Sequence, residues 1–203
     1  MKVTSHYHPT PHITIENIFP DDVLDSIWNE VDELHEHLLP PKETGSAHNN
    51  GELLKQNSGL YLYKHYGDKA GSSQIIQAMH NVVFHPQIVS AWKHDHLSKM
   101  VRITNWETCL LSYYSEGDSY HPHHDIAIFT TLIWLWREPK AFTGGDLTLN
   151  EYGYTIKTQN NCGVIFLSPE IHSVDSVIKT NRWLNKMDNY GRYCLTHFCG
   201  INH

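Results

Sequence analysis

The first half of the chain carries hydrophobic residues at helical spacing, interrupted by polar stretches. One apolar stripe repeats at intervals of one, three and four residues, as on one face of an amphipathic helix, and consists of Val23, Leu24, Ile27, Trp28, Val31 and Leu34. Pro and Asp within residues 19–22 suit the start of this helix, and Pro40-Pro41 would end it. Two further helices are predicted near 73–84 and 87–94, with a break at Pro86.

From Met100 onward the hydrophobic period changes to that of strands. Clusters of Gly, Asn and Asp separate several of the predicted strands, which cover residues 108–114, 120–125, 129–136, 146–149, 163–168, 171–177 and 192–199. Short strands at regular spacing over roughly 100 residues favour a jelly roll of two sheets, with the preceding helices packed on one outer face.

We therefore expect an α+β fold with a double-stranded β-helix (jelly-roll) core. The length of 203 residues fits a single domain, residues 1–203. Within it, residues 1–99 are expected to provide mostly helical support with one or two strands. Residues 100–203 are expected to form the jelly-roll core, which carries the candidate chemistry described below.

A polar stretch from Lys42 to Ser58 separates the first helix from a strand predicted at 60–63. It contains Gly45 and Gly51 and almost no apolar residue before Leu53. A connection of this length is unusual in a compact domain unless it is functional or disordered. Two interpretations stay open: a lid that closes over a substrate, or a tolerated surface insertion.

The composition is that of an ordinary globular protein, with 40% apolar and 18% charged residues. A net charge of −7 disfavours a nucleic-acid partner, because such binding depends largely on Lys and Arg at the phosphates. The longest apolar run, 127–136, is far shorter than the roughly 20 residues of a membrane span, so we expect no membrane partner and a cytoplasmic location. The oligomeric state stays open. Four cysteines without C-x-x-C spacing indicate buried free thiols.

Candidate chemistry begins with the triplet His123-His124-Asp125 and with His172 in a second predicted strand. Residues i and i+2 of a strand point to one face, so His123 and Asp125 can both reach one ion. Two histidines and a carboxylate form the facial ligand set of non-haem Fe(II), whereas structural zinc usually recruits four protein ligands. The chain has 17 histidines, so most of them are expected to be ordinary solvated side chains. His121 is a rival ligand, because it shares the strand face of His123.

The stretch from Leu111 to Cys199 resembles the prolyl-4-hydroxylase-like branch of the 2-oxoglutarate/Fe(II) dioxygenases. The matching parts follow the family's order: Tyr113, Tyr120-x-x-His123-x-Asp125, the strand 130–134, Gly144-Gly145-Asp146-Leu147, residues 163–166, His172-x-Val174 and Arg192-Tyr193-x-Leu195-Thr196. The match covers nearly half of the chain, and the N-terminal half adds only a compatible helix pattern.

This resemblance implies a dioxygenase with His123, Asp125 and His172 as ligands of Fe(2+) and no catalytic side chain beyond them. Arg192 would pair with the distal carboxylate of the cosubstrate 2-oxoglutarate, since a planar guanidinium matches a carboxylate bidentately. Tyr113 would face the same cosubstrate, although it also suits an ordinary strand. Ascorbate would be an auxiliary reductant.

The chain also departs from the family's pattern. Trp134 stands where relatives often carry a Tyr that hydrogen-bonds the cosubstrate, and Cys194 stands where many carry a Ser. An insertion around 181–190 separates His172 from Arg192 and contains Arg182, the fallback anchor for the carboxylate.

The resemblance favours hydroxylation of a prolyl or other peptide side chain, with release of succinate and CO2. The alternatives are a hydroxylase of a free amino acid or other small molecule, and a non-catalytic metal-binding jelly roll, which would not need Arg192. Nucleic-acid demethylation is disfavoured because Phe198 stands where that branch has a second Arg. Four aromatic residues could line a peptide groove, or serve only as core: Tyr61, Tyr63, Tyr66 and Trp106.

Overall fold

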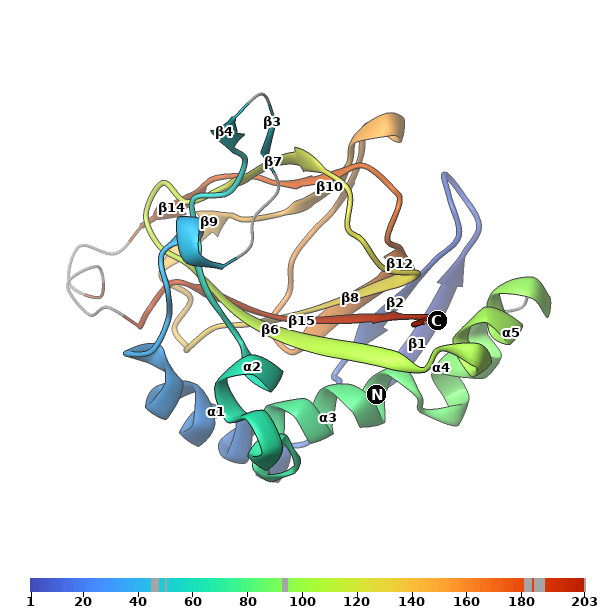
Figure 1. The fold of residues 1–203 in the computed structure, drawn as a ribbon. Helices are drawn as coiled ribbons and strands as arrows, with labels where there is room; N and C mark the ends of the chain where they lie inside the picture. The colour runs from blue at the N-terminus through green and yellow to red at the C-terminus, as the bar shows by residue number, and fades with distance from the viewer. Residues whose placement is uncertain (45–47, 50, 93–94, 181–183, 185–188, 203) are drawn as a thin grey trace.

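A seven-stranded antiparallel sheet runs through the middle of the molecule, in the order β1-β2-β12-β8-β15-β6-β5 (Figure 1). The computed structural model describes residues 1–203 except 45–47, 50, 93–94, 181–183, 185–188 and 203. The strands of this large sheet are β1 (Lys2–His6), β2 (His12–Glu16), β5 (Ser58–Tyr61), β6 (Trp106–Tyr114), β8 (Phe129–Leu135), β12 (Cys162–Leu167) and β15 (Arg192–Gly200).

A smaller sheet in the order β11-β10-β13-β7 faces the large one. Its strands are β7 (Tyr120–His123), β10 (Leu147–Leu149), β11 (Tyr154–Ile156) and β13 (His172–Val174). Two further pairs complete this side, namely β9 (Phe142–Gly144) with β14 (Val177–Lys179), and β3 (His48–Asn49) with β4 (Glu52–Leu53). One apolar cluster lies between the facing sheets, with Leu132 and Trp134 from the large sheet and Leu147 and Val174 from the small one.

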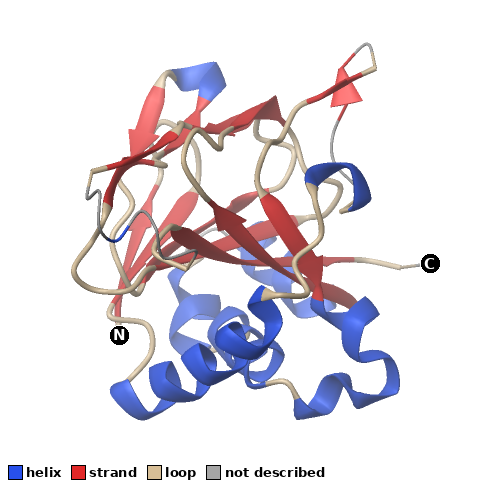
Figure 2. Cartoon of the chain, turned by 90° about the vertical axis from the view of Figure 1, so that its left-hand side faces the viewer, coloured by secondary structure: helices blue, strands red, loops and turns tan. Residues whose placement is uncertain are grey.

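The helices cover the outer face of the large sheet, on the side away from the small sheet (Figures 1 and 2). They are α1 (Asp21–His35), α2 (Leu62–Tyr66), α3 (Gln74–Val83), α4 (Pro86–Ala91) and α5 (Asp95–Ile103). A 3-10 helix at Gly67–Ser72 follows α2, and two others, Pro41–Glu43 and Asn150–Tyr152, lie outside this helical layer. The buried carboxylate of Glu30 joins three of these elements. It accepts hydrogen bonds from the Tyr66 hydroxyl (2.9 Å), the Ser73 hydroxyl (2.6 Å) and the Ile75 amide (2.9 Å) at the start of α3.

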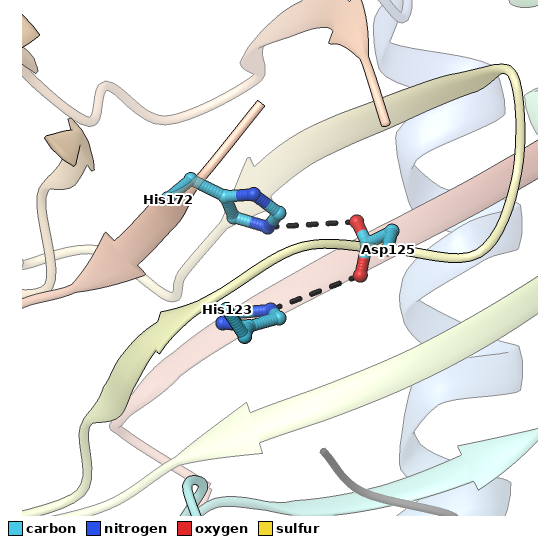
Figure 3. A group of neighbouring side chains, drawn as sticks. All are labelled: His123, Asp125 and His172. Atoms are coloured by element: carbon cyan, nitrogen blue, oxygen red, sulfur yellow. Dashed lines mark ion pairs between the residues drawn. The ribbon is translucent and has the colours of Figure 1, made fainter. Parts of the chain in front are cut away.

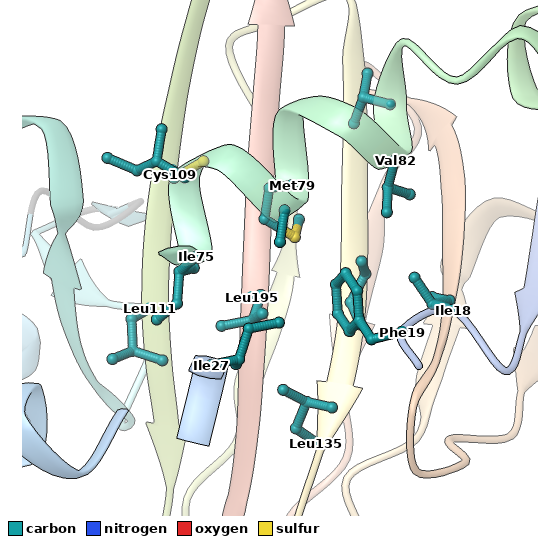
Figure 4. Packing of buried hydrophobic residues seen from close by; sticks show 14 of the residues in the cluster. Ile18, Phe19, Ile27, Ile75, Met79, Val82, Cys109, Leu111, Leu135 and Leu195 are labelled. Carbon is teal, nitrogen blue, oxygen red and sulfur yellow. The ribbon is translucent and has the colours of Figure 1, made fainter. Parts of the chain in front are cut away.

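Strand alternation gives the large sheet two buried faces. On β6, Cys109 and Leu111 point to the helices, where they pack with Ile27 and Met79 (Figure 4). The alternate residue Ser112 points to the space between the two sheets. Because both faces are covered, β8 is buried along its whole length, which explains why its sequence is an unbroken apolar and threonine run.

The α+β jelly roll with helices on one face is confirmed. Two details differ from expectation. The first 99 residues supply three strands to the large sheet rather than one or two, since β1 and β2 join it as well as β5. The edge strand β1 has one aliphatic residue, Val3, so its sequence gave no strand signal. Met100 lies in α5, where strand spacing was expected to begin.

The polar stretch 42–58 falls partly outside the described residues, at 45–47 and 50. Its other residues include the short β3–β4 pair and a segment that lies along the edge of β7. The His121 amide donates to the Leu54 carbonyl (2.8 Å), and the Gln56 amide donates to the Ser119 carbonyl (3.0 Å). This end of the stretch is therefore an extra strand-like segment on the small sheet.

Replacing Ile27 by Ala should lower the free energy of unfolding by about 2–5 kcal/mol, because Ile27 is fully buried between α1 and the sheet and its loss leaves a cavity. Urea denaturation followed by circular dichroism measures the change. Asn29→Ala, on the exposed side of the same helix, is the matched control and should stay within about 0.5 kcal/mol. Equal effects of the two variants would contradict this packing.

Candidate active site

The strand pair β7–β13 brings His123 and His172 directly opposite each other. Asp125 follows β7 and lies beside both rings (Figure 3). Its carboxylate oxygens lie 3.7 Å from Nε2 of His123 and 3.5 Å from Nε2 of His172. One ligand atom from each residue lies within 4.8 Å of the other two, and no other such group of His, Cys, Asp or Glu occurs within the described part of the chain.

Each histidine is oriented by a backbone carbonyl. Nδ1 of His123 lies 2.9 Å from the His121 carbonyl, and Nδ1 of His172 lies 2.8 Å from the Glu170 carbonyl. A carbonyl oxygen accepts only, so Nδ1 must carry the proton in both rings. The lone pair is then on Nε2, the atom that faces Asp125, as a metal ligand requires.

Asp125 lies just beyond β7, which ends at His123, rather than inside the strand that the sequence predicted. Its position comes from the loop instead. The Asp125 amide donates to the Ser168 carbonyl (3.0 Å), and the Thr130 hydroxyl donates to Oδ2 of Asp125 (2.7 Å). The hydroxyls of Thr130 and Ser168 lie 2.9 Å apart, so Ser168 helps to orient the Thr130 hydroxyl that bonds to Asp125.

The electrostatics of these three residues fit a divalent cation. Burial lowers the pKa of His123 to about 3, so its imidazole is neutral and free to donate its lone pair. Burial also raises the pKa of Asp125, since a lone carboxylate is costly in this environment and a cation would offset that cost. The rival ligand His121 and its neighbour His124 are exposed and lie outside the group.

A cavity extends from these residues into the space between the sheets. This metal cavity is lined by His123, Asp125, His172, Lys55, Asn57, Leu110, Ser112, Tyr114, Tyr120, Leu132, Val174, Arg192, Cys194, Thr196 and Phe198. The residues that β6 and β15 contribute are alternate ones, so only one face of each strand reaches the cavity.

Arg192 is fully buried in this cavity, and none of its guanidinium nitrogens has a hydrogen-bond partner among the described residues. Its Cζ lies 4.6 Å from the centre of the Tyr114 ring. Gly145 leaves room for the side chain, because a Cβ at that position would lie 2.7 Å from Cδ of Arg192. A buried, unpaired guanidinium fits an anionic ligand with planar oxygens, such as a carboxylate.

Tyr113 does not face this cavity, so the expectation for it is wrong. Its ring packs in the helix-side core beside Tyr193, and its hydroxyl accepts a hydrogen bond from the Gly191 amide (2.9 Å). The neighbouring Tyr114 points into the cavity instead. The sequence offered two adjacent tyrosines, and a shift of one residue reverses the face of a strand.

Two residues that depart from the family's pattern, Cys194 and Trp134, lie in different parts of the structure. Cys194 lines the metal cavity, whereas Trp134 packs in the cluster between the sheets, with no acceptor for its buried Nε1 among the described residues. Arg182 lies outside the described residues. All four cysteines are free and buried, as expected.

Sequence reasoning missed two polar residues of the cavity, Lys55 and Asn57. Both are buried, and Oδ1 of Asn57 has no hydrogen-bond partner among the described residues. Burial lowers the pKa of Lys55 to about 8. Their sequence gave no signal, because charged and amide side chains in a polar stretch are normally solvated.

An open groove, here called the mouth, adjoins the metal cavity. It is lined by Lys55, Tyr61, Trp106, Thr108, Leu110, Tyr120, His124, Asp125, Ile126 and Phe198. Tyr61 and Trp106 thus lie where a substrate would approach. Tyr63 and Tyr66 do not, because their hydroxyls donate to Glu107 (2.9 Å) and Glu30 (2.9 Å) on the helix side.

The fold and this donor set define a jelly-roll protein with a three-residue metal site that leaves coordination positions open. The model of the 2OG-Fe(II) oxygenase superfamily matches residues 109–197, a span that includes the metal-site residues and Arg192. Over this span the chain is similar to a superfamily of enzymes whose cofactors are Fe(II) and 2-oxoglutarate, and its group of His123, Asp125 and His172 fits Fe(II). No curated protein matches the chain in sequence.

Solved structures share the fold across nearly the whole chain. A prolyl-4-hydroxylase from Pseudomonas putida matches with a TM-score of 0.61 and 17% identity, covering 95% of this chain and 93% of its own. A prolyl hydroxylase from Trichoplax adhaerens, solved with a hypoxia inducible factor peptide fragment, matches with a TM-score of 0.63 and 17% identity. The match covers 93% of this chain and 83% of that protein. A non-haem α-ketoglutarate-dependent epimerase from nogalamycin biosynthesis matches with a TM-score of 0.52 and 9% identity. The match covers 94% of this chain and 77% of that protein.

These neighbours differ in what their names say they act on, so the shared fold does not select a substrate. Within the described residues, no helix is long and apolar enough to cross a membrane.

His123→Ala, Asp125→Ala and His172→Ala should each weaken Fe(II) binding by at least about 100-fold, because the site has only three protein ligands. Calorimetric titration with Fe(II) under anaerobic conditions measures the affinity. His121→Ala and His124→Ala are the controls and should keep the wild-type affinity. Loss of Fe(II) binding in His121→Ala, with binding retained in Asp125→Ala, would show that the ligand set is wrong.

Arg192→Met should weaken 2-oxoglutarate binding by about 2–5 kcal/mol, because it removes one side of a buried charge-assisted pair. Metal affinity should change little, since a protonated guanidinium has only hydrogen-bond donors and is not a metal ligand. Titration of 2-oxoglutarate into the Mn(II)-loaded protein separates the two effects. Arg102→Met, at an exposed position of α5, is the matched control. Wild-type cosubstrate affinity in Arg192→Met would exclude this anchor.

Proposed function

We propose that the protein is a 2-oxoglutarate-dependent hydroxylase that inserts oxygen into an unactivated C–H bond, with a prolyl or other peptide side chain as the first candidate substrate. One observation carries the proposal. The metal-ligand group and an unpaired buried guanidinium line the same cavity, and a non-catalytic metal site would need only the former.

In this proposal His123, Asp125 and His172 hold Fe(II), and no further side chain acts in the chemistry. Arg192 holds the distal carboxylate of 2-oxoglutarate, with Tyr114 packed against the guanidinium. When bound, the metal and cosubstrate supply the oxidising chemistry, in which one oxygen atom enters the substrate and the other leaves in succinate, with release of CO2.

The chain's own residues provide position and exclusion of water. The two backbone carbonyls keep the Nε2 atoms of His123 and His172 aimed at one point, and Thr130 keeps Asp125 turned toward the same point. Leu132 and Val174 line the same cavity with apolar surface. A dry pocket of this kind suppresses side reactions of a strong oxidant.

We also propose that residues 1–203 act as one domain. The supporting observation is that β1, β2 and β5, from the helical half, hydrogen-bond to strands of the C-terminal half in the same sheet. The division into a supporting half, 1–99, and a catalytic half, 100–203, would then be one of roles rather than of separate folding units.

The peptide substrate is supported by the aromatic lining of the mouth, where Trp106 is 39% exposed and Ile126 is 93% exposed. Exposed apolar residues beside a cavity suit contact with a partner molecule. The fold neighbour from Trichoplax adhaerens was solved with a peptide fragment. A free amino acid is the second candidate, favoured by the buried ammonium of Lys55 beside the metal ligands.

Incubation with Fe(II), 2-oxoglutarate and ascorbate should yield succinate, and a proline-containing peptide library should accelerate its release with addition of one oxygen atom to a peptide. Mass spectrometry follows both products. Asp125→Ala, with the metal site removed, is the control. If 2-oxoglutarate is never consumed above the level of this variant, the proposed hydroxylase activity is excluded. If free amino acids accelerate succinate release and peptides do not, the second candidate replaces the first.

A further inference from the structure

Lys55 is fixed beside the metal ligands by backbone pairing. Lys55 forms an isolated antiparallel bridge with Tyr120, and hydrogen bonds to β7 hold the residues on either side of it. Paired residues of an antiparallel bridge point to the same face. The Tyr120 ring stacks on His123 with a centroid distance of 3.5 Å, so this face is the one that carries the metal site.

The ammonium of Lys55 has no anionic partner among the described residues. Lys55 is 3% exposed, and among the described residues its ammonium donates one hydrogen bond, to the Thr44 carbonyl at 3.5 Å, the outer limit for such a bond. A buried charge without a counter-ion is strongly destabilising. An anionic ligand in the cavity would offset the free-energy cost of burying the Lys55 ammonium.

The cosubstrate does not account for this anion. The charges of Fe(II), the Asp125 carboxylate, the two carboxylates of 2-oxoglutarate and the Arg192 guanidinium cancel one another. Lys55 adds one further positive charge. It also lines both the metal cavity and the mouth, whereas Arg192 lines only the cavity. Lys55 thus lies on the side from which a second molecule would reach the metal.

We propose that Lys55 receives a carboxylate of the molecule that is hydroxylated, so that the substrate is an acid. This inference rests on the proposed hydroxylase function and narrows its substrate class. The carboxylate can come from a free amino acid or from an acidic side chain or C-terminus of a peptide.

Binding without turnover tests the inference. The protein is loaded with Mn(II) and 2-oxoglutarate, and two panels are titrated by calorimetry: L-amino acids with their carboxamides, and proline-containing peptides with acidic residues or their amides. Wild type should bind at least one acid about thirtyfold more tightly than its amide. Lys55→Met, which keeps the length of the side chain, should reduce this preference to within about threefold. Its 2-oxoglutarate affinity should equal that of wild type, which also shows that the variant is folded.

Lys64→Met, an exposed lysine of α2, is the matched control and should keep the wild-type preference. A preference confined to amino acids assigns the carboxylate to a small substrate, and one confined to peptides assigns it to a peptide. The inference is wrong if no acid binds wild type more tightly than its amide, if Lys55→Met keeps the preference, or if this variant instead loses 2-oxoglutarate affinity. Failure of wild type to form succinate from 2-oxoglutarate would count against the proposed function rather than against Lys55.

Discussion

The antiparallel pairing of β13 with β7 is the constraint on which the site depends. It sets His172 opposite His123, although the two residues are far apart along the chain. Both rings are further fixed by their own local carbonyls, so the metal-binding nitrogens converge without any contribution from the helices. Asp125 then needs only a short turn after β7 and the Thr130 hydroxyl to complete the group. The two histidines are thus positioned on paired strands, which hold side chains more precisely than loops do.

The large sheet connects this site to the helical half of the molecule. On β15, Arg192 and Cys194 face the cavity, while Tyr193 and Leu195 face the helices. The hydroxyl of Tyr193 lies 2.7 Å from Nδ1 of His35 at the end of α1. Successive side chains of a strand point to opposite faces. Packing of Tyr193 and Leu195 against the helices therefore also fixes the direction in which Arg192 and Cys194 point.

Much of this arrangement could be predicted from the sequence, and the failures have physical causes. The resemblance to the dioxygenases led us to expect His123, Asp125 and His172 close together with Arg192 nearby. The structure brings the three side chains together and buries Arg192 in the same cavity. Tyr113 was assigned to the wrong face because the sequence does not state the register of a strand containing two adjacent tyrosines. Lys55 was missed because its burial depends on tertiary pairing between a polar segment and β7, which no local pattern encodes.

Lys55 and Arg192 are two buried cations that line the same cavity. Neither side chain has an anionic partner within the described part of the chain, and both are almost completely buried. In a low-dielectric cavity a buried cation interacts strongly with an anion that contacts it directly. Arg192 lines only the metal cavity, whereas Lys55 lines both this cavity and the mouth. In the proposed function the cosubstrate would compensate Arg192, whereas Lys55 would still lack an anionic partner among the described residues. The carboxylate of a substrate would supply that partner, so the two cations of the cavity would serve two different ligands.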